Sequence, residues 1–273
     1  MDSLSKKSTG GRGNEKIKEC ANSLLNRYKS YVGTFSPPIQ PQVLAKLQNA
    51  KVIYRKGSDQ WVSSLMPMGK GFVINVNKVL SMARKRNAIC HEIAHTFFFD
   101  IESEPPRRLK THRPDDKEER LCFWAAREML VPTSLFKKEL NTLGCETLYS
   151  FEGISRLAKI FSVSPDIIAL RLTHDLALLE NDWIVLWYSN DKKDIRLRPM
   201  SLYPKHISDS ISDYMKHKIR ENLRILLELK ERENAGEVVV GKRKKLRLRV
   251  KTEKVEREQL RAISWVSPLS DFK

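Results

Sequence analysis

The segment His91-Glu92-Ile93-Ala94-His95 holds the residues of this chain whose types and spacing are best suited to chemistry. Residues four apart on a helix point the same way, so His91 and His95 can offer two imidazole nitrogens to one metal ion. Glu92 then lies beside the open side of that ion, where it can accept a proton from water. The pattern predicts a zinc hydrolase whose third ligand is a carboxylate from elsewhere in the chain. The alternative is an accidental match on an ordinary helix.

The composition is typical of a soluble globular protein. The chain has 273 residues, of which 41% are hydrophobic and 30% are charged, so it can bury a substantial core. No uncharged apolar run approaches the ~20 residues that cross a bilayer, and the first residues lack the apolar core of a signal peptide. We therefore expect a cytoplasmic protein that does not enter a membrane. Four cysteines without CxxC spacing predict buried thiols, with neither a disulfide nor a zinc knuckle: Cys20, Cys90, Cys122 and Cys145.

Positive charge accumulates in the last third of the chain. The formal net charge is +17, and residues 191–273 contain 22 Lys and Arg against 13 Asp and Glu. This excess suits an acidic partner, either nucleic acid or an acidic protein face, although a solvated basic surface would look the same. The densest basic run is the candidate contact for such a partner: Lys242, Arg243, Lys244 and Lys245.

The elements before the metal-binding segment are expected to cover and line it. Residues 1–15 are predicted to form a disordered tail, and apolar residues at helical spacing predict an amphipathic helix from Glu15 to about Tyr31. Three β-rich runs between Lys51 and Asn77 predict a small antiparallel sheet. In zinc proteases an edge strand of such a sheet can pair with an extended peptide substrate.

The third ligand should come from the helix that follows the metal-binding one. Residues 100–116 have no periodicity and predict a loop, after which a helix begins at Asp115 and Asp116 and ends at Pro132. Glu118 and Glu119 both lie near the apolar side of this helix, whereas Glu128 faces away from Glu119. Periodicity alone leaves Glu118 and Glu119 both open as ligands.

Residues 153–173 predict two short helices around a tight turn, the second beginning with Ser164 as cap and Pro165 at its first position. This geometry is compatible with a helix-turn-helix, but such pairs also serve as plain core, and the second helix offers only Asp166 and Arg171 as polar readers. A basic α+β region should follow, with strands at 183–188 and 195–198, a long helix over 207–227, and a hairpin of 238–240 with 246–250.

The stretch from Gly71 to Leu172 resembles the ImmA/IrrE family of bacterial metallopeptidases. Three features carry the resemblance: GFVINVN followed by a basic helix into HEIAH, ERLC leading to AAREMLVP, and LAKIFSVS with Arg171-Leu172 beyond it. The longer metzincin pattern is absent, because no third histidine follows His95 at the required spacing.

The resemblance implies a cytoplasmic zinc endopeptidase of gluzincin type that cleaves a helix-turn-helix transcriptional repressor and so releases stress-response or mobile-element genes. It assigns His91 and His95 as ligands, Glu92 as catalytic base and Glu119 as third ligand, with Zn²⁺ as the metal and Mn²⁺ as its alternative. The chain departs from the family pattern at Phe123, where Asn is usual, which affects hydrogen bonding around the ligands. No match identifies the group that stabilises the oxyanion, and His112 in the predicted loop is our candidate.

The expected fold class is α+β, with a zincin-like protease core in which a small antiparallel sheet accompanies the HExxH helix. We expect a tail at 1–15, a zinc metallopeptidase-like domain at 16–150, a helix-turn-helix-like segment at 151–177 and a basic α+β domain at 178–273, sensor-like or GAF-like in character. The rival function is a DNA-binding or repressor-sequestering regulator in which the metal site is structural.

Overall fold

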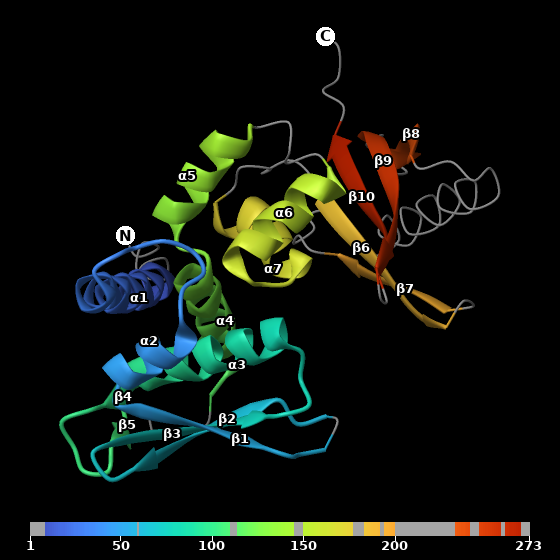
Figure 1. Cartoon of the computed structure of the whole chain (residues 1–273). Coiled ribbons are helices and arrows are strands. Elements are labelled where there is room, and N and C mark those ends of the chain that lie inside the picture. Colours follow the sequence, from blue (N-terminus) through green and yellow to red (C-terminus); the bar gives the residue numbers. More distant parts are fainter. Residues whose placement is uncertain are drawn as a thin grey trace, which may run out of the picture. The chain divides into compact units, whose positions relative to one another are not determined.

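The structure, a computed structural model, describes residues 9–58, 60–109, 114–144 and 150–176, together with five strands of the C-terminal region (Figure 1). The chain forms two compact units. One comprises residues 1–139 with 159–164, and the other comprises residues 140–158 with 165–273. Among the described residues, no helix combines the length and the apolar character that a membrane crossing would need.

The N-terminal helix is longer than the sequence pattern predicts. It begins at Thr9, so residues 9–14, which we expected in a disordered tail, are helical, and residues 1–8 lie outside the described part. Its predicted apolar side is buried: Ile17, Ala21, Leu24, Leu25 and Tyr28. The helices of the first unit are α1 (Thr9–Val32), α2 (Pro41–Leu47), α3 (Met82–His95), α4 (Asp116–Leu130) and most of α5 (Thr133–Leu143).

The small sheet of the first unit is mixed, and our prediction of an antiparallel sheet was wrong. Its strands are β1 (Ala50–Arg55), β2 (Ser63–Met68) and β3 (Gly71–Asn77), in the order β1-β3-β2. The tight turn at Gly69 makes β2 and β3 antiparallel, while the longer connection from β1 to β2 allows β3 to lie between them, parallel to β1. All seven residues of β3 are therefore buried, and β2 is an edge strand.

Helix α3 packs against this sheet and against α4. It contacts both β2 and β3, and among the described helices its contact with α4 is the most extensive. Figure 1 shows α3 between the sheet and α4. Between α3 and α4 the chain forms a short hairpin of β4 (Phe99–Asp100) and β5 (Arg107–Arg108), within the segment that we expected to be an irregular loop. Asp115 caps α4 by accepting a hydrogen bond from the Glu118 amide at 2.7 Å.

The predicted helix pair is present, and its second helix begins at Pro165 as expected. The helices are α6 (Phe151–Phe161) and α7 (Pro165–Leu170), and a π-helical turn, Arg171–Asp175, follows them. Ser162, in the turn between them, adopts the left-handed conformation with φ +52°. Arg171 is fully buried and forms an ion pair with Asp175 at 3.3 Å, so it belongs to the core.

The second unit contains a five-stranded antiparallel sheet. Its order is β7-β6-β10-β9-β8, and the predicted hairpin is present, with Val240 opposite Leu246. The strand β10 (Leu260–Pro268) was not predicted. The others are β6 (Trp183–Asp191), β7 (Asp194–Pro199), β8 (Glu233–Val240) and β9 (Leu246–Arg257). The predicted helix at 207–227 lies outside the described residues, and the GAF-like character stays a prediction.

Candidate metal centre

Two histidines of α3 face each other at its C-terminal end. Ser81 caps the helix start, and the helix continues without interruption to His95. The Nε2 atoms of His91 and His95 lie 3.1 Å apart, and the two rings are nearly perpendicular, with an interplanar angle of 83°. Two ring nitrogens at this distance can share either a proton or a metal ion.

A carboxylate from α4 completes this cluster. Glu119 places Oε2 at 3.2 Å from Nε2 of His91 and Oε1 at 3.4 Å from Nε2 of His95. Ligand atoms at about 2.05 Å from a tetrahedral zinc ion are separated from one another by about 3.3 Å. The separations of 3.1, 3.2 and 3.4 Å are each close to this value, the last two being measured to the two different oxygens of Glu119. The two imidazoles and the carboxylate therefore converge closely enough to share one zinc ion. Glu119 is 39% exposed, so the side of the cluster that it borders is open to solvent.

The electrostatics of the cluster suit a metal ligand. Burial, together with the nearby His95, lowers the pKa of His91 to about 4, so its imidazole is neutral at physiological pH. A neutral imidazole keeps the nitrogen lone pair that binds a metal. His91, His95 and Glu119 are thus one group of residues in the described part that could hold an ion.

Glu92 lies beside the cluster and is held by the edge strand of the sheet. Its side chain is buried, and Ser63 at the start of β2 donates a hydrogen bond to its Oε1 at 2.6 Å. Burial raises the pKa of Glu92, while the Ser63 hydrogen bond acts in the opposite direction. Sequence reasoning did not identify Ser63, because a serine in a β-rich run carries no signal of its own.

Glu118, the rival ligand, points to the other nitrogen of His95. Its Oε1 lies 3.1 Å from His95 Nδ1, and Arg108 donates to both of its oxygens from Nη2, at 2.8 and 2.6 Å. Helical periodicity could not separate Glu118 from Glu119, because the contact with Arg108 carries no periodic signal. Glu118 is indeed buried, with 4% of its side chain exposed, but a guanidinium compensates its charge.

Cys122 approaches the same nitrogen of His95, with Sγ 3.4 Å from Nδ1. The pKa of Cys122 is raised by burial and by the neighbouring carboxylates Glu118 and Glu119. His95, Glu118 and Cys122 could on distance alone form a second metal group. Arg108 already occupies both oxygens of Glu118, so a cation there would have to displace a guanidinium.

Phe123, at the position where the family usually has Asn, packs against His91. The two ring centroids are 4.3 Å apart, and 46% of Phe123 is exposed. His91 Nδ1 is buried and has no hydrogen-bond partner among the described residues. His91 is therefore held by ring packing, whereas His95 is held by a hydrogen bond.

The remaining predicted site residues lie elsewhere. Glu128 is buried and accepts hydrogen bonds from the amide and the hydroxyl of Thr133, both at 2.9 Å, at the start of α5. It is therefore separate from the cluster, as the helical periodicity indicated. His112 and the basic run from Lys242 to Lys245 lie outside the described residues.

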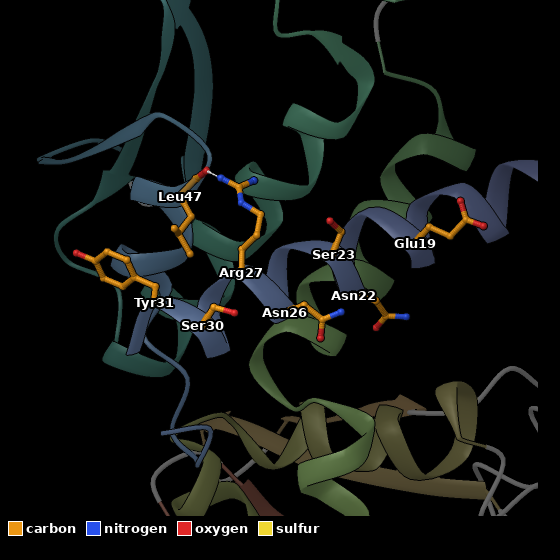
Figure 2. Close-up of a pocket in the computed structure, with 8 residues that line it drawn as sticks. All are labelled: Glu19, Asn22, Ser23, Asn26, Arg27, Ser30, Tyr31 and Leu47. Atoms are coloured by element: carbon orange, nitrogen blue, oxygen red, sulfur yellow. Dashed lines mark hydrogen bonds between the residues drawn. The ribbon is translucent and has the colours of Figure 1, made fainter. Parts of the chain in front are cut away.

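A shallow groove of about 830 Å³ runs along the outer face of α1, apart from the histidine cluster (Figure 2). Arg27 crosses it to the carbonyl oxygen of Leu47, and most of the other residues that line it are of polar types. None of the candidate metal ligands lines it.

Comparison with protein families identifies the region around the cluster. Residues 46–173 match the peptidase M78 model, described as the IrrE N-terminal-like domain. The chain therefore carries an IrrE N-terminal-like domain. This confirms the resemblance to the ImmA/IrrE family, and the histidine cluster lies within the matched residues. The match suggests a peptidase of metallopeptidase type.

Among solved structures, a Mycobacterium tuberculosis transcriptional regulator is similar, with a TM-score of 0.51 and 12% sequence identity. The match covers 94% of this chain and 78% of that chain. At this identity the similarity concerns the fold alone. A search of curated proteins found no significant match.

Proposed function

We propose that this protein is a zinc-dependent endopeptidase whose metal is held by His91, His95 and Glu119. The observation that carries the proposal is the convergence of two imidazole nitrogens and one carboxylate group, with N···N and N···O separations of 3.1, 3.2 and 3.4 Å that are close to those between zinc ligands. Bound there, zinc would supply Lewis acidity that activates water and polarises the scissile carbonyl. The family match and the neutral imidazole of His91 support the same assignment. Mn²⁺ is the alternative metal.

Glu92 is the general base of this proposal. It follows a ligand directly in sequence, so it lies beside the metal without being needed to bind it. Its carboxylate would accept the proton of the attacking water and deliver it to the leaving amine. The hydrogen bond from Ser63 fixes the carboxylate in one orientation, which favours proton transfer along one direction.

The substrate segment is an extended peptide that pairs with β2. Along two antiparallel strands, directly opposite residues alternate between pairs that are joined by backbone hydrogen bonds and pairs that are not. Because the Asn77 amide donates to the carbonyl of Val62, the backbone groups of Ser63, Leu65 and Pro67 point away from β3, toward the free edge. Proline has no amide hydrogen, so Ser63 and Leu65 supply the outward donors of this strand. These donors begin at the residue that contacts Glu92.

The substrate protein is proposed to be a helix-turn-helix transcriptional repressor, whose cleavage would release stress-response or mobile-element genes. The family resemblance supports this class of substrate. The similar fold of a transcriptional regulator is compatible with a regulatory setting.

The rival function is DNA binding with a structural metal. One of the two polar side chains that we expected to contact DNA bases is not available for that role. Arg171 is fully buried and paired with Asp175, so it cannot reach a base edge without breaking the core. Of the two polar readers expected from the sequence, Asp166 remains, and a carboxylate is repelled by phosphates.

The test is incubation of the purified, zinc-loaded protein with the repressor encoded beside its gene, followed by mass spectrometry of the products. Glu92→Gln should retain zinc and lose cleavage, whereas His91→Ala should lose both. Glu128→Gln, on the opposite side of α4, is the matched carboxylate control and should keep both. Cleavage by Glu92→Gln at the normal rate would exclude the proposed mechanism, and a stable uncut complex with the wild type would indicate a sequestering partner.

A further inference from the structure

We propose that Arg108 is a positioning residue for the metal centre, acting through Glu118 on His95. The proposal rests on the assignment of His91, His95 and Glu119 as metal ligands. Neither the sequence motifs nor the family match assigns Arg108 to the site, and Glu118 was considered above only as a rival ligand. It predicts that the hairpin between α3 and α4 controls how tightly the chain holds its metal.

The hydrogen bonds from the hairpin to the ligand form one continuous chain. Arg108, the last residue of β5, donates from Nη2 to both oxygens of Glu118, at 2.8 and 2.6 Å. Glu118 Oε1 then lies 3.1 Å from Nδ1 of His95. An ionised carboxylate can only accept, so His95 must carry its hydrogen on Nδ1, which leaves the lone pair on Nε2. Nε2 is the nitrogen that faces His91 and Glu119.

Arg108 is itself fixed in place by its surroundings. Its guanidinium carbon lies 5.3 Å from the centre of the Phe99 ring, on the partner strand β4. Phe99 in turn packs edge-on against Phe72 of β3, with the centroids 5.2 Å apart. Arg108 is therefore anchored to the central sheet, and its side chain is 23% exposed. A guanidinium held in this way can fix a carboxylate more firmly than a flexible surface cation can.

Burial explains why Glu118 needs this partner. The Glu118 side chain is 4% exposed and that of His95 is 9% exposed, so water cannot replace a missing hydrogen bond at either. Without the guanidinium, this buried carboxylate would turn away from the ring, and Nδ1 of His95 would lose the acceptor that fixes the position of its hydrogen. The ring could then carry its hydrogen on Nε2 and would no longer present a lone pair to the metal. Cys122, at 3.4 Å from Nδ1, is a weaker partner for the ring.

Zinc affinity, measured by competition with a chelating dye, tests the proposal on the full-length protein. Arg108→Gln should bind zinc about 10- to 100-fold more weakly, which is the loss expected when an outer partner of a ligating histidine is removed. Arg108→Lys keeps the charge without the planar fork, and its affinity should lie between those of the wild type and Arg108→Gln. Arg107→Gln, its exposed neighbour on the same strand, is the matched control and should bind zinc as the wild type does.

Two further measurements separate positioning from a general loss of structure. The double variant Arg108→Gln/Glu118→Gln should bind zinc no more weakly than Glu118→Gln alone, because Arg108 acts only through Glu118. In the cobalt-substituted protein, Arg108→Gln and Glu118→Gln should keep the visible absorption of the four-coordinate ion, whereas Glu119→Gln should change it.

Unchanged zinc affinity in Arg108→Gln, or additive losses in the double variant, would overturn the proposal. A cobalt spectrum that changes in Glu118→Gln as it does in Glu119→Gln would also overturn it, by showing that Glu118 is a ligand. If His91→Ala and His95→Ala both retain wild-type zinc affinity, the failure belongs to the proposed metal centre itself.

Discussion

Replacing Asn77 with Ala should destabilise the end of β3 and the two segments that its side chain holds. Asn77 is fully buried at the end of β3, and its Nδ2 donates to the carbonyl oxygens of Ser58 and Trp61, at 3.0 and 2.9 Å. Its Oδ1 accepts from the Val79 amide at 3.3 Å. These bonds fix the loop that leads into β2 and the turn that leads into α3. At about 1 kcal/mol for each buried hydrogen bond, their loss should cost about 2 to 4 kcal/mol.

Asn75, two residues earlier on the same strand, is the matched control. It is also buried, but its Nδ2 contacts only the sulfur of Met66 at 3.5 Å, and its Oδ1 has no partner among the described residues. Asn75→Ala creates a similar cavity and removes one weak bond, so it should cost about 1 kcal/mol or less.

Hydrogen exchange of peptides covering β3, followed by mass spectrometry, measures both variants without requiring the two units to unfold together. Asn77→Ala should reduce protection by about 30- to 700-fold, since 1.4 kcal/mol corresponds to a factor of ten. Asn75→Ala should reduce it by about fivefold or less. Equal losses in the two variants would show that side-chain volume, and not the hydrogen bonds of Asn77, stabilises this strand.

Three further outcomes are expected. Asp115→Ala, which removes the cap of α4, should destabilise the first unit by about 1 kcal/mol in urea denaturation and leave the zinc stoichiometry unchanged. Phe123→Ala should lower zinc affinity by less than Arg108→Gln does, because it removes ring packing against His91 but no hydrogen bond; an equal or larger loss in a chelator competition would contradict this ranking. Burial raises the pKa of the Cys90 thiol from 9.0 to about 12, so the unfolded chain loses this proton at a lower pH than the folded chain does. The contribution of Cys90 to the free energy of unfolding should therefore fall as pH rises from 9 toward 12. At pH 8, peptide mapping should find Cys90 alkylated only after denaturation.

Local patterns in the sequence anticipated much of the first unit. The capped start of α4, the helix that carries both histidines, and the convergence of Glu119 on them all follow from helical periodicity together with the family pattern. Helical periodicity does not identify the hydrogen-bond or ion-pair partner of a buried polar side chain. Glu118 and Glu119 are adjacent and both near the apolar side, so their different roles depend on Arg108, whose loop has no periodic signal. Likewise, the parallel pairing of β1 with β3 depends on the path of the loop that joins β1 to β2. Runs of β-forming residues do not encode that path.

The proline in β2 has a consequence for how selective this protein can be. A long free strand edge would bind almost any unfolded chain, including a nascent one or a second copy of the protein, because backbone bonds do not depend on sequence. Pro67 shortens the ladder, since it offers a carbonyl but no amide to the free edge. A peptide paired with this edge would therefore form fewer backbone hydrogen bonds than it would along an uninterrupted strand. Under the proposed function, discrimination among proteins would therefore depend also on side chains around the candidate metal centre, where Phe123 presents an exposed ring.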